Sequence, residues 1–284
     1  MKRHLANLFA ALALLFIPLT SSAQQTVFTK KARLADFTTK TTKVVLSGNE
    51  ILDAALKEEV MSAWRLSPYE FCSAEEFNTL KTSSKYYFLH LGISDANPGL
   101  AVLTIIKGGK ADDSVDAYYE VMQMPFADAQ TASGKGFIYM GAYLDIIQRY
   151  LEDAINSDLT GYKGLEVYNK KPKSYSDKEI YIAREDLGRT VNDALIEKVF
   201  GDNLHLCSAD EVDSIFLEGR PDAVVGVLLV PNRPVKGSFC YKMLITTDSH
   251  ELLMFEKKKC DLYAYRGFQD TDIKEIEKAR SRKK

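Results

Sequence analysis

The chain has 284 residues, of which 46% are hydrophobic and 27% charged, and its 37 basic side chains nearly balance its 39 acidic ones. This is the composition of an ordinary globular protein with enough apolar residues to bury a core, and the low counts of 16 Gly and 8 Pro exclude collagen-like and linker-dominated architectures. The near-neutral balance disfavours a nucleic-acid-binding protein, which normally carries clustered positive charge.

The first 23 residues have the pattern of a secretory signal peptide. Lys2 and Arg3 give a positive start, residues 8–17 are apolar, and Ser21 and Ala23 stand three and one before a predicted cut after Ala23. The apolar stretch is too short for a permanent membrane helix, and no later stretch is long enough to span a bilayer. No cysteine follows the predicted cut, so we expect an exported protein without a lipid anchor. The ending Ser-Ala-Gln-Gln resembles signals of Bacteroidota envelope proteins, which implies the periplasm.

An internal repeat organises the rest of the chain. The six residues CSAEEF that begin at Cys72 return at Cys207 as CSADEV, and ALKEEV at Ala55 returns at Ala194 as ALIEKV. Self-similarity at a fixed order along the chain is typical of a duplicated domain. We therefore expect two copies of one structural unit.

In the first copy, apolar residues at spacings of three and four predict a helix from residue 49 to Trp64. Ser73 and Glu76 form a capping box at the start of a second helix, and residues 95–99 form a turn between two strands. The predicted elements are strand 43–46, helix 49–64, strand 69–72, helix 73–80, strands 86–93, 100–107 and 118–124, and helix 137–156.

The second copy repeats this order. Thr190 and Asp193 are placed as a capping box, and the apolar run 223–230 predicts a central strand that is buried on both faces. The predicted elements are strand 180–183, helix 190–200, strand 204–207, helix 208–219, strand 223–230, a hairpin of 241–246 and 252–257 turning at 248–250, and a helix from 270.

Both copies therefore read β-α-β-α-β-β-β-α, which predicts an α/β (α+β layered) fold with a mixed sheet and helices packed on it. The predicted boundaries are a signal peptide at 1–23, a first repeat at 24–157, a linker at 158–176 and a second repeat at 177–284.

Two motifs of the second copy resemble the small α/β domain at the amino terminus of the TolB family, which has relatives in the curli-secretion-channel family and in lipoprotein activators of peptidoglycan synthases. The segment from Asp222 to Val227, DAVVGV, is similar to the central strand of that domain, and the segment from Leu244 to Leu253 is similar to its hairpin. The sequence departs from these families in two ways: it lacks the propeller repeats of the TolB family and the lipidated cysteine of the other two families. The resemblance implies a non-enzymatic module that binds other envelope proteins.

The sequence carries none of the common catalytic or phosphate-binding motifs, so no catalytic, cofactor-binding or metal-binding residue is assigned and no cofactor is expected. His90 and His205 fall in predicted strands, where packing is favoured over a role as general base. His250 falls in the hairpin turn, where we expect exposure to solvent. Nothing in the sequence brings the three together as a zinc site or a nucleophile–base pair.

The four cysteines suggest two different roles. Cys240 and Cys260 flank the predicted hairpin nearly opposite each other, so a disulfide is possible if the register brings their Cα atoms close enough. Cys72 and Cys207 occupy equivalent strand-to-helix junctions, where small buried side chains are expected.

We expect an exported, non-catalytic envelope protein that acts as a protein-binding or assembly module. Edge strands would offer β-strand addition to a partner, and the 15 tyrosines would supply either a partner surface or the interface between the repeats. The alternative is a hydrolase or transferase with a site in the cleft between the repeats that includes His90 or His205. A small-ligand carrier is a third possibility and would require a large apolar cavity. The expected partners are other envelope proteins, with no nucleic acid and no transmembrane segment; peripheral contact with the envelope and the oligomeric state stay open.

Overall fold

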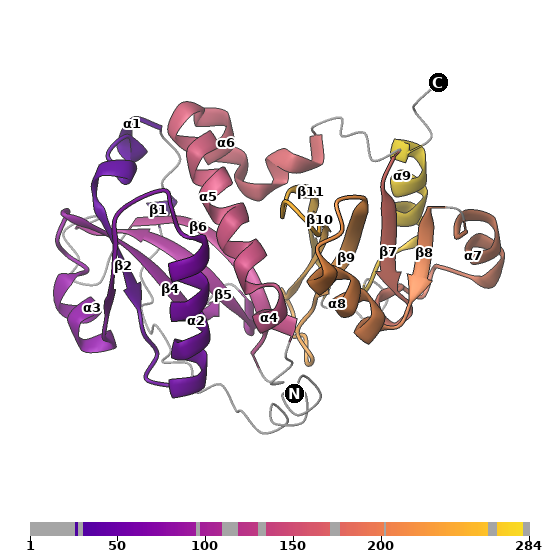
Figure 1. Ribbon diagram of the computed structural model, residues 1–284, viewed down its shortest axis with the longest axis horizontal. Coiled ribbons are helices and arrows are strands. Elements are labelled where there is room, and N and C mark those ends of the chain that lie inside the picture. The colour runs from indigo at the N-terminus through magenta and orange to yellow at the C-terminus, as the bar shows by residue number, and fades with distance from the viewer. Residues whose placement is uncertain are drawn as a thin grey trace. The chain divides into compact units, whose positions relative to one another are not determined.

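The computed structural model describes residues 26–27, 31–94, 97–109, 119–129, 135–170, 177–201, 203–260 and 266–280. The chain divides into two compact units, Met1–Leu165 and Glu166–Lys284 (Figure 1). The predicted signal peptide, residues 1–23, lies outside the described residues, as do the segments 95–96, 110–118, 130–134 and 281–284.

The first unit is a mixed sheet with helices on both faces. Its strands lie in the order β1-β6-β5-β4-β2-β3, with β2 parallel to β3 and β4, β5 antiparallel to both of its long neighbours, and the short β1 parallel to β6. Its elements are β1 (Thr26–Val27), α1 (Lys31–Leu34), η1 (Phe37–Thr39), β2 (Thr41–Val45), α2 (Glu50–Ala63), β3 (Tyr69–Cys72), α3 (Ala74–Leu80), β4 (Tyr86–Ser94), β5 (Asn97–Lys107), β6 (Tyr119–Asp128), α4 (Lys135–Ile138), α5 (Met140–Asn156) and α6 (Asp158–Lys163).

The helices of the first unit begin where the sequence supplies side-chain caps. Asn49 accepts a hydrogen bond from the backbone N–H of Leu52 and starts α2, and Ser73 with Glu76 forms the predicted capping box of α3. The apolar faces of α2 and α5 pack against each other on one side of the sheet. On the other side, Phe77 of α3 lies in a core cluster with strand residues that include Phe88.

The second unit has a five-stranded sheet in the order β11-β10-β9-β7-β8. Here β7 is parallel to β8 and β9, and β10 is antiparallel to β9 and β11. Its elements are η2 (Gly164–Lys170), which begins at the boundary, β7 (Glu179–Ala183), η3 (Arg184–Asp186), α7 (Asp193–Val199), β8 (Leu204–Cys207), α8 (Ala209–Glu218), β9 (Ala223–Leu229), β10 (Phe239–Thr246), β11 (Leu252–Lys259) and α9 (Asp270–Arg280).

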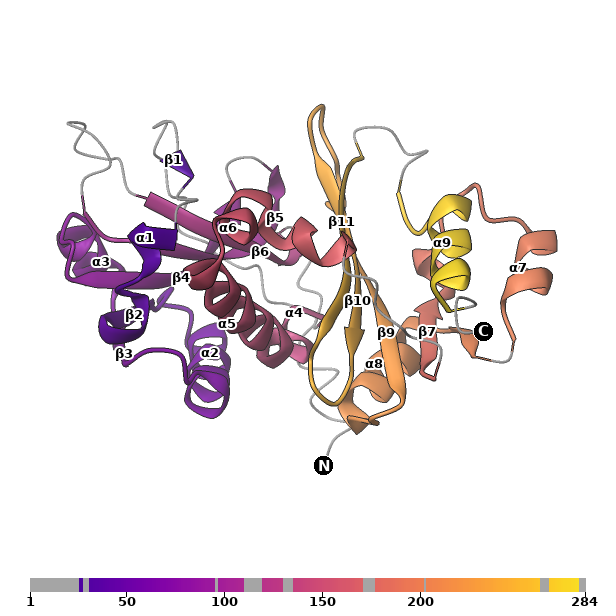
Figure 2. The same cartoon turned by 90° about the horizontal axis from the view of Figure 1, so that it is seen from above.

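Two helices cover opposite faces of the second sheet. Ile273 and Ile276 of α9 pack on one face in a cluster with Ile182, whereas α8 contacts β7 and β9 from the other side (Figure 2). Gly226 lies in the centre of β9. A side chain does not fit there without a shift of its neighbours, because a Cβ would come within 3.1 Å of Ile182 and 3.4 Å of Phe268. The predicted central strand is confirmed at this position.

The predicted duplication is confirmed by the topology. Without β1, both sheets have the same strand order and the same strand directions, and α2, α3 and α5 correspond to α7, α8 and α9. The repeated cysteines align by register, since Val45 pairs with Cys72 and Ala183 pairs with Cys207. Ser208 also forms a capping box with Glu211, as Ser73 does with Glu76.

Two sequence expectations need correction. The cap of α7 is Asn192, which accepts a hydrogen bond from Leu195, and not Thr190 with Asp193. The predicted helix 137–156 is two helices, α4 and α5, separated at Tyr139. The predicted linker, 158–176, holds α6 and most of η2 and includes the boundary between the units at Leu165 and Glu166; its residues 171–176 lie outside the described residues.

Candidate functional site

Cys240 and Cys260 lie at the open end of the β10–β11 hairpin. The register places Cys240 opposite Lys258, two residues before Cys260, and the backbone N–H of Cys260 donates to the carbonyl of Ser238 at 2.9 Å. Side chains alternate between the faces of a strand, so both cysteines point to the same face of the sheet. Both are fully buried, and their thiols are in hydrogen-bond contact without a disulfide.

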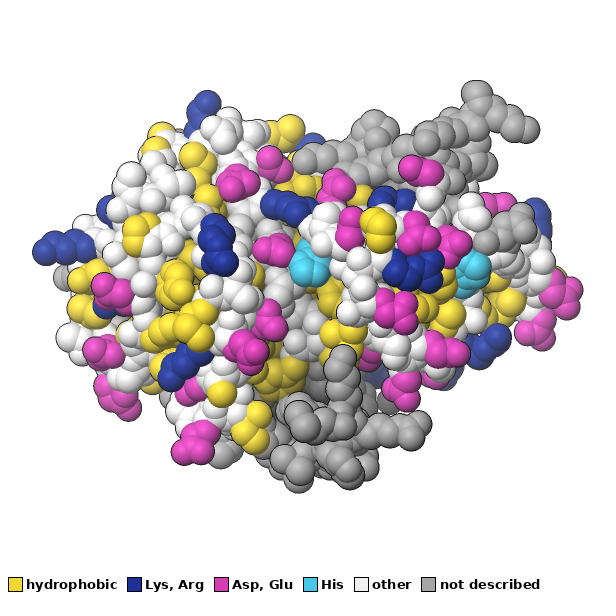
Figure 3. Space-filling view, viewed as in Figure 1, with side chains coloured by type: hydrophobic (Ala, Val, Ile, Leu, Met, Phe, Trp, Pro, Cys, Tyr) yellow, Lys and Arg dark blue, Asp and Glu magenta, His cyan; other side chains and the backbone are white. Residues whose placement is uncertain are grey.

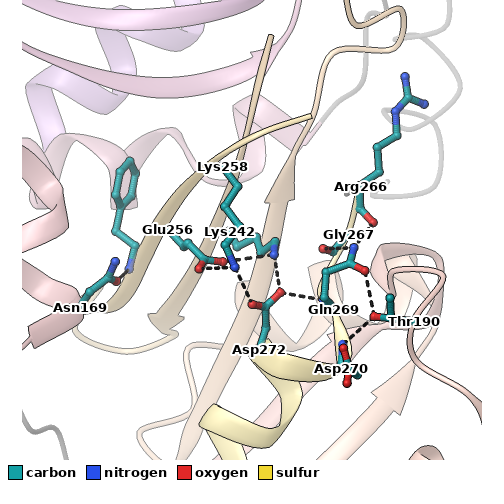
Figure 4. Close-up of polar contacts among 11 residues, drawn as sticks. Asn169, Thr190, Lys242, Glu256, Lys258, Arg266, Gly267, Gln269, Asp270 and Asp272 are labelled. Carbon is teal, nitrogen blue, oxygen red and sulfur yellow. Dashed lines mark hydrogen bonds and ion pairs between the residues drawn. The ribbon is translucent and has the colours of Figure 1, made fainter. Parts of the chain in front are cut away.

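A buried charge cluster follows on the same face, made of Lys242, Glu256, Lys258 and Asp272. The side chain of Lys242 is fully buried and contacts the carboxylate of Asp272, which is 4% exposed. Lys242 Nζ lies 3.1 Å from Glu256, and Lys258 Nζ lies 2.7 Å from Glu256 and 3.3 Å from Asp272. Figure 4 shows the two ammonium groups and the two carboxylates converging from β10, β11 and α9. This buried charge cluster is therefore internally paired.

The buried charge cluster is linked to the start of α9. Asp272 accepts the backbone N–H of Gln269 at 2.7 Å, and Thr190 donates to Gln269 while accepting the backbone N–H of Asp270 (Figure 4). Burial alone would raise the pKa of Asp272, but hydrogen bonds from Lys242 and Gln269 lower it below its ordinary value. The cluster thus holds the first turn of α9 against β10.

The first unit has an apolar pair at the corresponding place. Along equivalent registers, Leu103 pairs with Met124 in β5 and β6, as Lys242 pairs with Glu256 in β10 and β11. Leu103 and Met124 are both fully buried. The same sheet is therefore built with apolar side chains in one unit and with charges in the other, so the fold itself does not require the charges.

A second set of polar residues is partly exposed at the strand starts of the second unit, and we call it the Arg220 cluster. The guanidinium of Arg220 lies 5.6 Å from the ring centroid of Tyr181 and donates to Glu179 at 2.8 Å and to Asp222 at 2.9 Å. Tyr181 donates to Glu179 and stacks on His205, with centroids 4.7 Å apart. On the face drawn in Figure 3, charged side chains of both signs gather over this unit.

Hydrogen bonds within the Arg220 cluster favour the charged forms of its two carboxylates, Glu179 and Asp222. Hydrogen bonds from Tyr181 and Arg220 lower the pKa of Glu179, and that from Arg220 lowers the pKa of Asp222. Their side chains, and that of Arg220, are 36–49% exposed. The Arg220 cluster can therefore offer a fixed cation and two carboxylates to a ligand from solvent.

The first unit carries a similar set at the same place, which we call the Lys43 cluster. Lys43 of β2 forms an ion pair with Glu70 of β3, and its Nζ lies 5.2 Å from the ring centroid of Tyr86. The hydrogen bond with Glu70 raises the pKa of Lys43. By register, Lys43 pairs with Glu70 as Tyr181 pairs with His205. Both units thus place a cation on a tyrosine ring beside a glutamate at their strand starts.

The three described histidines are separated and each stacks on an aromatic ring of its own unit. His90 stacks on Phe77 at 5.6 Å, and burial lowers its pKa to about 4. His205 stacks on Tyr181, and His250 stacks on Phe216 at 5.6 Å. His250 is half-buried rather than exposed to solvent as expected, because this stacking covers one side of the ring.

Cys72 and Cys207 lie at the strand-to-helix junctions expected for them. Cys72 is buried and Cys207 half-buried, and burial raises the pKa of both, to about 11 for Cys72. A raised pKa disfavours the nucleophilic thiolate. Within the described ranges, no group of His, Cys, Asp and Glu is arranged to hold a metal ion.

Sequence reasoning missed both the buried charge cluster and the Arg220 cluster. Lys242 lies two residues before Leu244, so both side chains point to the same inward face of the strand. A lysine at such a position is a signal for a buried charge. Arg220, in contrast, meets Tyr181 and Glu179 only through the fold. In the part of the chain that the structure describes, no helix has the length and apolarity needed to cross a membrane. Comparisons with protein-family models, curated proteins and solved structures find no match to the chain.

Proposed function

We propose that this chain is an exported, non-catalytic protein of the bacterial cell envelope that acts as a protein-binding or assembly module. The export follows from the signal-peptide pattern of residues 1–23. The role as a binding module follows from the resemblance of the second unit to the TolB-type domain and from the surface of that unit. Its contact site is the Arg220 cluster.

The observation that carries the proposal is the partly exposed guanidinium of Arg220, which lies on the buried ring of Tyr181. Arginine and tyrosine are enriched among the residues that dominate binding energy at protein interfaces. Glu179 and Asp222 hold the guanidinium over the ring, so little side-chain entropy remains to be lost when a partner binds. Leu217, in the last turn of α8 and three residues before Arg220, is 68% exposed and adds apolar area.

Site-specific crosslinking in the exporting cell tests this function. A photo-crosslinking amino acid replaces Leu217, and captured proteins from the envelope fraction are identified by mass spectrometry. We expect one recurrent envelope protein. Its capture should fall about tenfold when Arg220 is also changed to Ala, because loss of such an interface residue costs more than about 1 kcal/mol.

A matched control separates a binding role from a general charge effect. Lys274 forms an exposed ion pair with Asp270 on α9, away from the Arg220 cluster, so Lys274→Ala removes the same charge without touching the proposed contact. Capture should be unchanged in this variant. Equal capture by the Arg220→Ala and parent chains, or no recurrent envelope protein at all, would contradict the proposal.

A further inference from the structure

We propose that Cys240 and Cys260 are joined by a disulfide in the exported protein, and that this bond staples the open end of the β10–β11 hairpin. The inference rests on the proposed export, because disulfides form and persist in oxidising compartments such as the periplasm. It adds a covalent modification site that the binding function does not require.

The geometry of the hairpin brings the two thiols together. Cys240 of β10 lies opposite Lys258 of β11. Cys260, two residues after Lys258, is the next residue on the same face of the hairpin. The ladder continues past the end of β11, since the N–H of Cys260 still bonds to Ser238. The two sulfurs are in hydrogen-bond contact in a fully buried position, so the pair has to close from that contact to the ~2 Å length of a disulfide bond.

The surroundings also favour reaction at this pair over the other two cysteines. The hydrogen bond from the Cys260 thiol lowers the pKa of Cys240, and the nearby ammonium of Lys242 acts in the same direction. Burial raises the pKa of Cys72 and Cys207 instead. The folded unit therefore favours the thiolate of Cys240 and disfavours the thiolates of Cys72 and Cys207.

The oxidation needs a partner, which we identify as the disulfide of an envelope thiol–disulfide oxidase. The thiolate of Cys240 attacks that disulfide and forms a mixed disulfide, and the thiolate of Cys260 then displaces the oxidase from Cys240. Two S–H bonds are lost, one S–S bond forms, and the two electrons and two protons leave with the oxidase as a dithiol. Because both thiols are fully buried in the folded unit, the exchange takes place before the hairpin closes.

Differential alkylation tests the bond on the full chain purified from the envelope. The protein is unfolded in iodoacetamide without reductant and digested for mass spectrometry. We expect Cys72 and Cys207 to be alkylated, and Cys240 and Cys260 to be recovered as one linked peptide pair that is lighter by two hydrogen atoms. After reduction, all four cysteines should be alkylated. Four alkylated cysteines without reduction, or Cys240 linked to another cysteine, would overturn the inference.

Two further measurements separate this inference from the proposed function. The intact mass of the envelope protein shows whether residues 1–23 have been removed, which reports on export alone. The reduced, unfolded chain is also refolded in a glutathione redox buffer, where failure of Cys240 and Cys260 to pair overturns the inference whatever the outcome of export. A reductant should lower the unfolding temperature of the oxidised parent chain, leave a Cys240→Ala/Cys260→Ala variant unchanged, and still act on a Cys72→Ala control.

Discussion

Replacing Lys242 with leucine tests whether the buried charges of the second unit form one interdependent set. Leucine is the residue at the corresponding place of the first unit, where Leu103 pairs with Met124, so the size and apolar character of the substitution suit the sheet. The variant removes the ammonium that pairs with Asp272 and Glu256. What it leaves behind is a buried carboxylate.

The expected loss of stability follows from the burial of these groups. Removing one partner of a buried ion pair costs about 3–5 kcal/mol, because the remaining charge is left uncompensated. Asp272 is only 4% exposed, but Lys258 is 41% exposed and lies 3.3 Å from its carboxylate. Lys258 can therefore take over part of the pairing, so the expected cost of Lys242→Leu is about 3 kcal/mol.

A triple variant provides the matched control. Lys242→Leu with Glu256→Met restores the apolar pair of the first unit, and Asp272→Asn keeps an acceptor for the N–H of Gln269 while removing the charge. Lys258, the fourth member of the cluster, is 41% exposed, so its ammonium can turn to solvent. Replacing a buried ion set by well-packed neutral residues is often neutral or stabilising. We expect the triple variant to recover to within about 1 kcal/mol of the parent chain.

Hydrogen exchange followed by mass spectrometry at neutral pH measures the opening free energy of peptides from each unit separately. Peptides from β9 to β11 should report the loss, whereas peptides from β4 to β6 serve as the internal reference. The fluorescence of Trp64, the sole tryptophan, buried in the first unit, provides a second reference. A loss below about 1 kcal/mol in the single variant, or a triple variant as unstable as the single one, would refute the reasoning.

Two other predictions concern single side chains. Burial lowers the pKa of His90 to about 4, so the neutral imidazole stabilises the fold above the ordinary pKa of about 6.5, and this stability is lost as the pH falls from about 6.5 towards 4. Between pH 7 and 5 the loss should reach about 2 kcal/mol in urea titrations of the parent chain and be absent from His90→Phe; equal pH dependence in both would contradict it. Ser208→Ala, which removes the capping box of α8, should cost about 1 kcal/mol, measured by hydrogen exchange of α8, with Ser73→Ala producing the same loss only in α3; an unchanged α8 would contradict it.

The order of elements was predictable because it depends on local patterns. Apolar spacing, turn residues and repeated segments lie within a few residues of one another, and the capping box of Ser73 and Glu76 is written in four consecutive positions. Thr190 was assigned to a cap by the same logic, and this was wrong. Its hydroxyl bonds to Gln269, 79 residues further along the chain, and no local pattern shows such a partner.

The candidate sites were less predictable for the same reason. The closeness of Cys240 and Cys260 could be predicted from the sequence because a hairpin connects them, but the two-residue offset in their register could not. The Arg220 cluster contains side chains from β7, β8 and the segment before β9. It could be predicted only from the strand order β9-β7-β8, which the sequence does not show. The strand pattern places Lys242 on an inward face. Its partner Asp272 could not be predicted, because it lies 30 residues away on a helix.

The unlike pairs at equivalent places of the two sheets should also disfavour the exchange of strands between the two copies while the chain folds. Tandem copies of one fold are prone to exchange strands between copies while they fold. If β11 paired with β5, Glu256 would be buried opposite Leu103, and if β6 paired with β10, Met124 would leave Lys242 without Glu256. Either hybrid would leave a charge at this position without its cross-strand partner, at a cost of several kcal/mol. The charges therefore favour the pairing of β10 with β11 over pairing with a strand of the other copy.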